Sequence, residues 1–171
     1  MTRLLLTLLS VILISLCGCS TVDDERIPNM PVNIRLADAG TWNSFGVAGF
    51  GSHRQFILAN GIRQPRSFPF SEMSATGFGG VLLISGIDPF SNDTDIPLAY
   101  DLACPVERDA KVIVEIENET YSAVCHSCGS VFNVTTAGGS PISGPAASGT
   151  PCGLRRYQCI SSGAGGYLIT N

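Results

Sequence analysis

The segment CHSCGSVFNVTTAGGSPISGPA, residues 125–146, carries the strongest structural signal in this chain. It places two cysteines three positions apart, follows them with Gly-Ser and an aromatic residue, and continues into a glycine-rich turn and a Gly-Pro-Ala loop. A third cysteine, Cys104, stands twenty-one positions before Cys125. Structural metal sites commonly combine a CxxC pair with more distant ligands, so this layout predicts a metal site held on loops.

The rest of the sequence predicts strands rather than helices. Short windows alternate apolar and polar side chains, which is the two-residue period of a half-buried strand, and Gly- and Pro-rich turns separate them. After residue 19, no window longer than eight residues shows a convincing helical period. The predicted strands are 31–36, 55–59, 80–85, 97–102, 111–117, 120–124, 154–160 and 167–170. We therefore expect an all-β chain, an antiparallel β-sandwich or small barrel with long loops.

The order of these parts resembles the Rieske iron–sulfur family, in which a C-x-H loop precedes a C-x-x-H-G-S-x-F loop. Here Cys104-Pro105-Val106 stands at the first loop and Cys125-His126-Ser127-Cys128 at the second. Gly144-Pro145-Ala146 corresponds to the proline-containing loop that covers the cluster in the family. The resemblance covers residues 99–157, and it implies a Rieske-like domain over residues 28–171 with a cysteine-loop subdomain.

The resemblance implies that Cys104 and Cys125 are thiolate ligands, but both ligand histidines of the family are missing. Val106 occupies the first histidine position and cannot bind a metal. Cys128 occupies the second and can. The hairpin over residues 111–124 is expected to bring the two loops together, with the sulfur atoms of Cys104 and Cys125 within about 10 Å if they share a metal whose bonds to sulfur are about 2.3 Å.

A fourth ligand is needed, and Cys152 in the extended third loop is the main candidate. His126 is a second candidate, although a residue beside a ligand in a CxxC knuckle usually points away. Three states of the site stay open. Two use the same four cysteines, as a two-iron two-sulfur cluster or as a structural zinc site. The third has no metal, with Cys125 and Cys128 joined as a disulfide or two cysteines bridged across loops. The proposed ligands are Cys104, Cys125, Cys128 and Cys152.

Replacing imidazole by thiolate adds negative charge to such a site. Any cluster should therefore have a low reduction potential. Plant-type ferredoxins, with cysteine ligands only, have potentials of about −400 mV, whereas Rieske centres span about −150 to +300 mV.

Residues 1–18 are predicted to be a lipoprotein signal peptide. A short positive start with Arg3 precedes an apolar run over residues 4–16, which is shorter than the about 20 residues of a spanning helix. The sequence Leu16-Cys17-Gly18-Cys19 resembles a bacterial lipobox, and it predicts cleavage before Cys19 and attachment of lipid to that thiol. An ordinary secretory peptide cut elsewhere, or an uncleaved anchor, remains an alternative.

Residues 19–27 are predicted to form an acidic tether that contains Asp23, Asp24 and Glu25. This run resembles an acidic signal that some Bacteroidetes lipoproteins use to reach the cell surface, and the alternative is a solvated leash. The expected location is the bacterial envelope, with a lipid anchor in the outer membrane and with exposure at the surface if the signal operates.

Composition excludes some partners. Without Arg3 the chain has nine basic and fourteen acidic side chains, a formal charge of −5, which argues against a nucleic-acid partner because such proteins present a basic stripe.

Five cysteines remain beyond the lipobox, an odd number, so at least one is not in an intramolecular disulfide. Cys159 shares a face with Tyr157 in the strand over residues 154–160, and we expect it to be buried and not bridged to Cys152.

The remaining candidates have simpler roles. His53 is expected to be a surface residue of a Gly-rich loop. Ser130 lacks the Asp–His partners of a hydrolase, and the family resemblance implies that it hydrogen-bonds a cluster sulfur. Tyr157 matches a tyrosine that bonds a ligand cysteine in some family members, with core packing as the alternative. The turn aspartates are expected to be solvated caps rather than a calcium loop: Asp88, Asp93 and Asp95.

Two functions follow from these expectations. The first is a membrane-anchored envelope lipoprotein with a degenerate Rieske-like domain, without a true Rieske cluster, that acts as an interaction or structural module. The second is an electron-transfer or redox-sensing protein that binds a two-iron two-sulfur cluster, or a structural zinc protein, through its cysteines. Its partner would be a redox or envelope protein. An enzyme is not expected, since the chain has two histidines and lacks the second domain that Rieske oxygenases carry.

Overall fold

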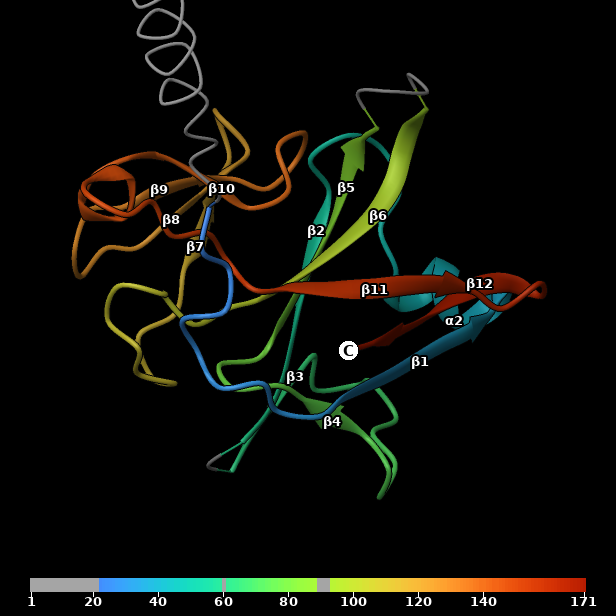
Figure 1. Ribbon diagram of the computed structural model, residues 1–171. Helices are drawn as coiled ribbons and strands as arrows, with labels where there is room; N and C mark the ends of the chain where they lie inside the picture. The colour runs from blue at the N-terminus through green and yellow to red at the C-terminus, as the bar shows by residue number, and fades with distance from the viewer. Residues whose placement is uncertain (1–21, 60, 89–92) are drawn as a thin grey trace, which may run out of the picture.

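The computed structural model describes residues 22–59, 61–88 and 93–171 (Figure 1). The predicted signal peptide and the lipid acceptor Cys19 lie outside the described residues. The protein is mostly β, with an eight-stranded antiparallel sheet curled into a half-barrel, a separate four-stranded antiparallel sheet and one short α-helix. This architecture confirms the expected all-β fold with a cysteine-loop subdomain.

The large sheet has the strand order β3-β2-β5-β6-β11-β12-β1-β4. Its strands are β1 (Val32–Asp38), β2 (His53–Ala59), β3 (Ile62–Gln64), β4 (Ala75–Thr76), β5 (Val81–Ile87), β6 (Thr94–Asp101), β11 (Arg156–Ser161) and β12 (Gly165–Thr170). The sheet curls far enough for the backbone N–H of Leu58 on β2 to donate a 3.1 Å hydrogen bond to the Thr76 hydroxyl on β4. Two strands near opposite edges of the sheet are thereby joined.

The small sheet has the order β10-β9-β8-β7 and carries the cysteine segment. Its strands are β7 (Glu115–Glu117), β8 (Ser122–Val124), β9 (Val131–Asn133) and β10 (Ser140–Ser143), and a 3-10 turn (Pro145–Ala147) follows β10. In Figure 1 this sheet lies at one end of the half-barrel. The predicted hairpins β7–β8 and β11–β12 are both present as antiparallel pairs.

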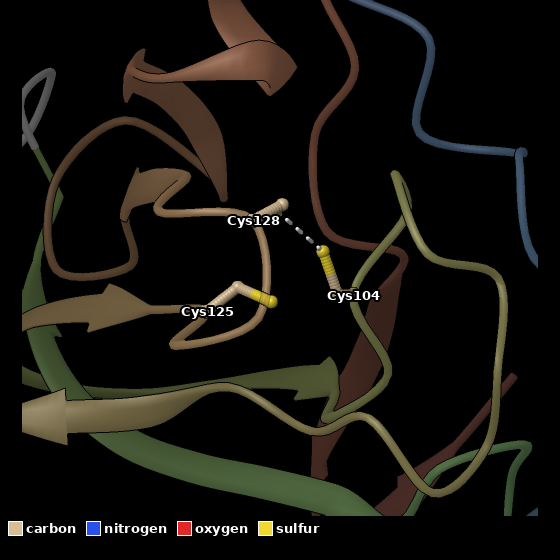
Figure 2. Close-up of side chains that lie close together, drawn as sticks. All are labelled: Cys104, Cys125 and Cys128. Atoms are coloured by element: carbon tan, nitrogen blue, oxygen red, sulfur yellow. Dashed lines mark hydrogen bonds between the residues drawn. The ribbon is translucent and has the colours of Figure 1, made fainter.

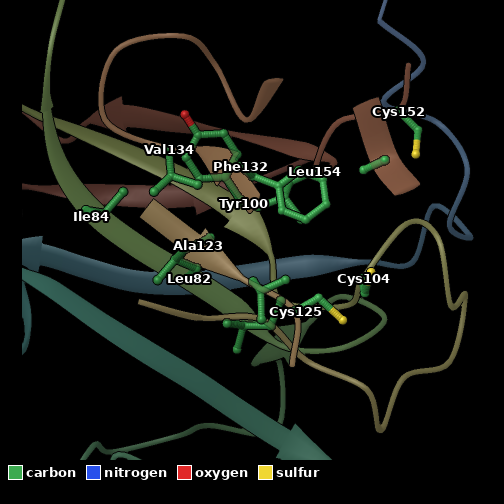
Figure 3. Packing of buried hydrophobic residues seen from close by; sticks show 13 residues of the cluster. Leu82, Ile84, Tyr100, Cys104, Ala123, Cys125, Phe132, Val134, Cys152 and Leu154 are labelled. Atoms are coloured by element: carbon green, nitrogen blue, oxygen red, sulfur yellow. The ribbon is translucent and has the colours of Figure 1, made fainter. Parts of the chain in front are cut away.

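Strand β5 separates two hydrophobic cores, because its successive side chains point to opposite faces. Leu82 and Ile84 pack with Phe132 of the small sheet and with three cysteines in the first core (Figure 3). Val81 and Leu83 face the other way and pack inside the half-barrel with Phe56. With both faces covered, β5 is a continuous apolar run rather than an alternating one.

The structure differs from the predicted elements in several places, and the short strands β3, β4, β9 and β10 were not predicted. The predicted strand 111–117 begins only at Glu115, because the preceding residues pair with the chain that follows β6: the N–H of Val114 donates to the carbonyl of Leu102. Helix α2 (Ala39–Phe45) has no counterpart in the predictions, since seven residues are too few for a clear helical period. Its start is stabilised by Asp38, whose carboxylate accepts hydrogen bonds from the N–H and hydroxyl of Thr41. No helix within the described ranges is long and apolar enough to cross a membrane.

Candidate metal centre

Three cysteines converge at the junction of the two sheets. The Sγ atoms of Cys104, Cys125 and Cys128 all lie within 4.8 Å of one another, and the Cys104 and Cys128 sulfurs are 3.7 Å apart. Figure 2 shows the three side chains directed toward a common point between two loops. The predicted proximity of the Cys104 loop and the 125–128 loop is therefore confirmed.

Local backbone hydrogen bonds build the CxxC loop. It begins where β8 ends, and the N–H of Cys125 donates to the carbonyl of Ser130 while the N–H of Gly129 donates to the carbonyl of Cys125. Gly129 has a φ of 73°, a left-handed conformation that glycine adopts without steric cost. The sequence Cys-Gly-Ser thus turns the chain sharply, and it places both cysteines on the same side of the turn.

The loop that carries Cys104 is held by longer-range pairing. The N–H of Cys104 donates to the carbonyl of Val112, and its own carbonyl accepts from the N–H of Arg108. An isolated antiparallel bridge between Ala103 and Ile113 continues this pairing. Cys104 is fully buried, whereas Cys128 is only half-buried, so the site opens to solvent on the side of Cys128.

The spacing of the three thiols fits a single tetrahedral ion. With metal–sulfur bonds of about 2.3 Å, two sulfurs of a tetrahedron lie about 3.8 Å apart. The separation of 3.7 Å between the sulfurs of Cys104 and Cys128 has this length, and all separations within the group stay below 4.8 Å. The sulfurs of Cys104 and Cys128 therefore match two corners of a tetrahedral thiolate site, and the sulfur of Cys125 lies within 4.8 Å of both.

The pKa values of Cys104 and Cys128 are shifted in opposite directions. Burial raises the pKa of Cys104 to about 12. Burial also acts to raise the pKa of Cys128, but hydrogen bonds with Ser130 and with the neighbouring thiols outweigh it and lower the pKa. The Cys128 thiol donates to the Ser130 hydroxyl at 3.1 Å, and that hydroxyl can rotate to donate to the thiolate after deprotonation. Cys128 is therefore better prepared to ionise than Cys104.

The Gly-Pro-Ala loop is fastened over this site by Ser130, which is fully buried. The Ser130 hydroxyl accepts a 3.0 Å hydrogen bond from the N–H of Ala146, and the carbonyl of Ala146 accepts from the N–H of Cys152. Gly144 passes so close to the CxxC loop that an added Cβ would lie 2.6 Å from the carbonyl oxygen of Gly129. Ser130 thus contacts the thiol of Cys128, whereas the resemblance implied a bond to a cluster sulfur, and it also positions the covering loop.

Cys152 lies beside the site but outside the group of three mutually close thiols. It is buried in the first core with Cys104 and Cys125, and Figure 3 shows it in the covering loop, apart from those two. Burial raises the pKa of Cys152, and Cys128 is among the neighbouring groups that act on it electrostatically. The fourth-ligand role predicted for Cys152 stays a prediction.

The other sequence candidates stand away from the three sulfurs. His126 is exposed, and its Nε2 lies 3.5 Å from a carboxylate oxygen of Glu115, so it points out of the knuckle as expected. Val106 packs against the first core. His53 is the first residue of β2 rather than part of a loop, and its Nδ1 lies 3.3 Å from the Gly51 carbonyl oxygen. Asp95 lies on β6 rather than in a turn, and its carboxylate accepts long-range hydrogen bonds from the N–H of Gly49 and the hydroxyl of Ser85.

Tyr157 bonds a carboxylate and not a cysteine. Its hydroxyl donates a 2.5 Å hydrogen bond to Asp101, which is fully buried at the end of β6. The same carboxylate accepts from the N–H groups of Phe78, Gly79 and Ala103. Burial raises the pKa of Asp101, although these hydrogen bonds oppose the rise.

Sequence reasoning missed Asp101. The signal available was a lone acidic residue between an apolar strand and the first cysteine loop. The bond to Ala103 ties this carboxylate to the residue that precedes Cys104.

Cys159 is half-buried on β11, where it packs against the second core, and burial raises its pKa to about 12. All five cysteines of the described domain are free thiols, so none of the disulfides considered from the sequence is present.

The structure shows an all-β protein in which three cysteines on two loops lie close together. The chain matches no known family model, and it has no significant match among curated proteins.

Proposed function

We propose that this protein is a membrane-tethered module that binds a metal ion through cysteine thiolates. The observation that carries the proposal is the convergence of three Sγ atoms within 4.8 Å in a site that is partly shielded from solvent. This geometry favours the metal-binding function over an interaction module without metal. The resemblance to the Rieske family supports the expected fold class. The lipobox in the sequence supports a lipid anchor at Cys19.

The proposed ligands divide into two groups. Cys104, Cys125 and Cys128 supply three thiolates from two loops, and Cys152 of the covering loop supplies the fourth. Cys152 fits this role because it is buried in the same core as the other three cysteines and is hydrogen-bonded through its N–H to the loop that Ser130 fastens. Four thiolates form the donor set that structural zinc prefers.

The spacing favours one ion over a two-iron cluster. A two-iron cluster distributes its protein ligands over two metals, whereas the 3.7 Å between the sulfurs of Cys104 and Cys128 is the separation expected around one centre, and the sulfur of Cys125 lies within 4.8 Å of both. A Rieske cluster also needs two imidazoles, and Val106 and Cys128 stand where the family has them. We therefore propose zinc as the metal. A bound zinc ion would link the two cysteine loops and stabilise the small sheet.

The proposal is tested by measuring the metal content and the visible absorption of the purified full-length protein in detergent. We expect stoichiometric zinc without colour, and loss of that zinc in the Cys125→Ser variant but not in Cys159→Ser, which alters a thiol outside the site. Iron–sulfur absorption would support electron transfer instead. A metal-free protein whose thermal stability does not change with chelator would favour the interaction module.

A further inference from the structure

The segment that follows the predicted anchor is bound to the domain. The N–H of Asp23 donates a 2.9 Å hydrogen bond to the carbonyl of Pro151, and the carbonyl of Asp23 accepts a 3.0 Å bond from the N–H of Gly153. These bonds form a parallel bridge between Asp23 and Cys152. The acidic run that the sequence predicted as a tether therefore lies against the covering loop from Asp23 onward.

Side chains reinforce this attachment. Arg26 pairs with the Asp23 carboxylate at 3.2 Å and also donates to the carbonyl of Thr150. Arg155 donates a 2.8 Å hydrogen bond to the carbonyl of Ile27, whose side chain is 2% exposed. In Figure 1 the described chain begins beside the small sheet, at the end of the molecule that carries the cysteine loops.

The distance from the anchor to this attachment is short. Four residue steps separate Cys19 from Asp23, and a fully extended chain covers at most about 3.6 Å per residue, or about 14 Å. A compact domain of about 145 residues has a radius of gyration near 15 Å, and hence a diameter of about 38 Å. A lipid on Cys19 therefore cannot reach around the domain, and only the face near Asp23 can lie at the membrane.

We infer that this face, formed by residues 22–26 and the covering loop 147–152, rests against the lipid headgroups of the membrane that holds the anchor. The inference depends on the lipid anchor of the proposed function. The metal site then lies on the membrane-facing side, and any protein partner of the site must approach along the membrane plane.

The test uses the lipidated full-length protein in phosphatidylcholine vesicles that contain a lipid with a nitroxide on its headgroup. The single tryptophan, Trp42, is replaced by Phe, and one new tryptophan is introduced as a reporter. Thr150→Trp places the reporter on the covering loop, where Thr150 is exposed. Ile160→Trp is the matched control, since Ile160 is 47% exposed near the far end of β11.

Quenching by the headgroup nitroxide is expected to be several-fold stronger for the Thr150→Trp reporter than for Ile160→Trp. Equal quenching of the two reporters, or stronger quenching of Ile160→Trp, would overturn the inference. Flotation with vesicles and the mass of the acylated N-terminus are measured in the same samples. A protein that carries no lipid and does not float would reject the anchor itself, and the inference with it, whatever metal the protein contains.

A second pair of variants tests the attachment. Asp23→Pro removes the N–H that donates to Pro151, so the tether lengthens and the difference in quenching between the reporters should shrink. Asp24→Pro removes an equal charge and restricts Asp23 to the extended conformation that the bridge already requires, so the difference should persist. If both variants leave the difference unchanged, the bridge at Asp23 does not orient the domain.

Discussion

The Tyr157 hydroxyl on β11 donates a hydrogen bond to the buried Asp101 carboxylate at the end of β6. Asp101 in turn accepts from the N–H of Ala103, the residue before Cys104. One carboxylate therefore joins two strands of the half-barrel and positions the start of the first cysteine loop. A buried carboxylate needs such partners, because an unpaired charge in the protein interior costs several kcal/mol.

The Tyr157→Phe substitution tests this arrangement. It removes one donor from Asp101 and leaves the buried carboxylate with a lone pair unsatisfied, which should lower the free energy of unfolding by about 1–3 kcal/mol. Chemical denaturation measures the change. Tyr167→Phe, at a half-buried position on β12, is the control and should cost less. Equal losses for the two variants would mean that the hydrogen bond to Asp101 contributes little.

The fourth-ligand role of Cys152 predicts an unequal effect of two cysteine substitutions. Cys152→Ser should weaken zinc binding strongly, because serine does not supply the thiolate that the site needs. Cys159→Ser should leave the affinity unchanged, since Cys159 packs against the other core. Competition with a chromophoric chelator gives the affinities. Equal affinities in the two variants would remove Cys152 from the ligand set.

The thiols of the metal-free protein should differ in reactivity. The pKa of Cys128 is lowered, whereas burial raises that of Cys104 to about 12, and only the thiolate is alkylated rapidly. As pH rises from 6 through 9, the Cys128 peptide should therefore be modified by iodoacetamide before the Cys104 peptide. Mass spectrometry of the digested protein follows the order. Earlier modification of Cys104 would contradict the assigned hydrogen bonding at Cys128.

The close packing of the covering loop makes Gly144 sensitive to a single methyl group. Gly144→Ala combines a positive φ of 79° with a contact of 2.6 Å to the Gly129 carbonyl oxygen. Gly163→Ala is the control, because its φ of 74° is also positive but nothing lies within 4 Å of the added Cβ. Gly144 combines its positive φ with a ψ of −168°, a conformation that is essentially restricted to glycine, so both the backbone and the clash penalise Gly144→Ala. Thermal unfolding should show a larger loss of stability for Gly144→Ala than for Gly163→Ala. Equal losses would mean that the covering loop shifts to accommodate the added methyl group without cost.

Local sequence determined most of the strands and the form of the CxxC loop. The alternation over residues 31–36 predicted β1, because one face of that strand is buried and the other is not. Gly129 after Cys128 allows the sharp turn of that loop, because glycine adopts the left-handed conformation that the turn requires. Strand 111–117 was predicted too long, since periodicity does not show which neighbour a segment pairs with, and here residues 112–114 pair with the chain after β6.

Only the tertiary structure decided which cysteines meet. Cys104 approaches Cys128 because the small sheet packs on the half-barrel where β6 ends, and that packing depends on contacts between residues far apart in the chain. The same contacts bury Asp101 and pair Asp23 with the covering loop. The local sequence predicts strands from their periodicity and turns from their residue types. The distance between two loops depends on the register of every strand that connects them, so it appears only once the sheets are assembled.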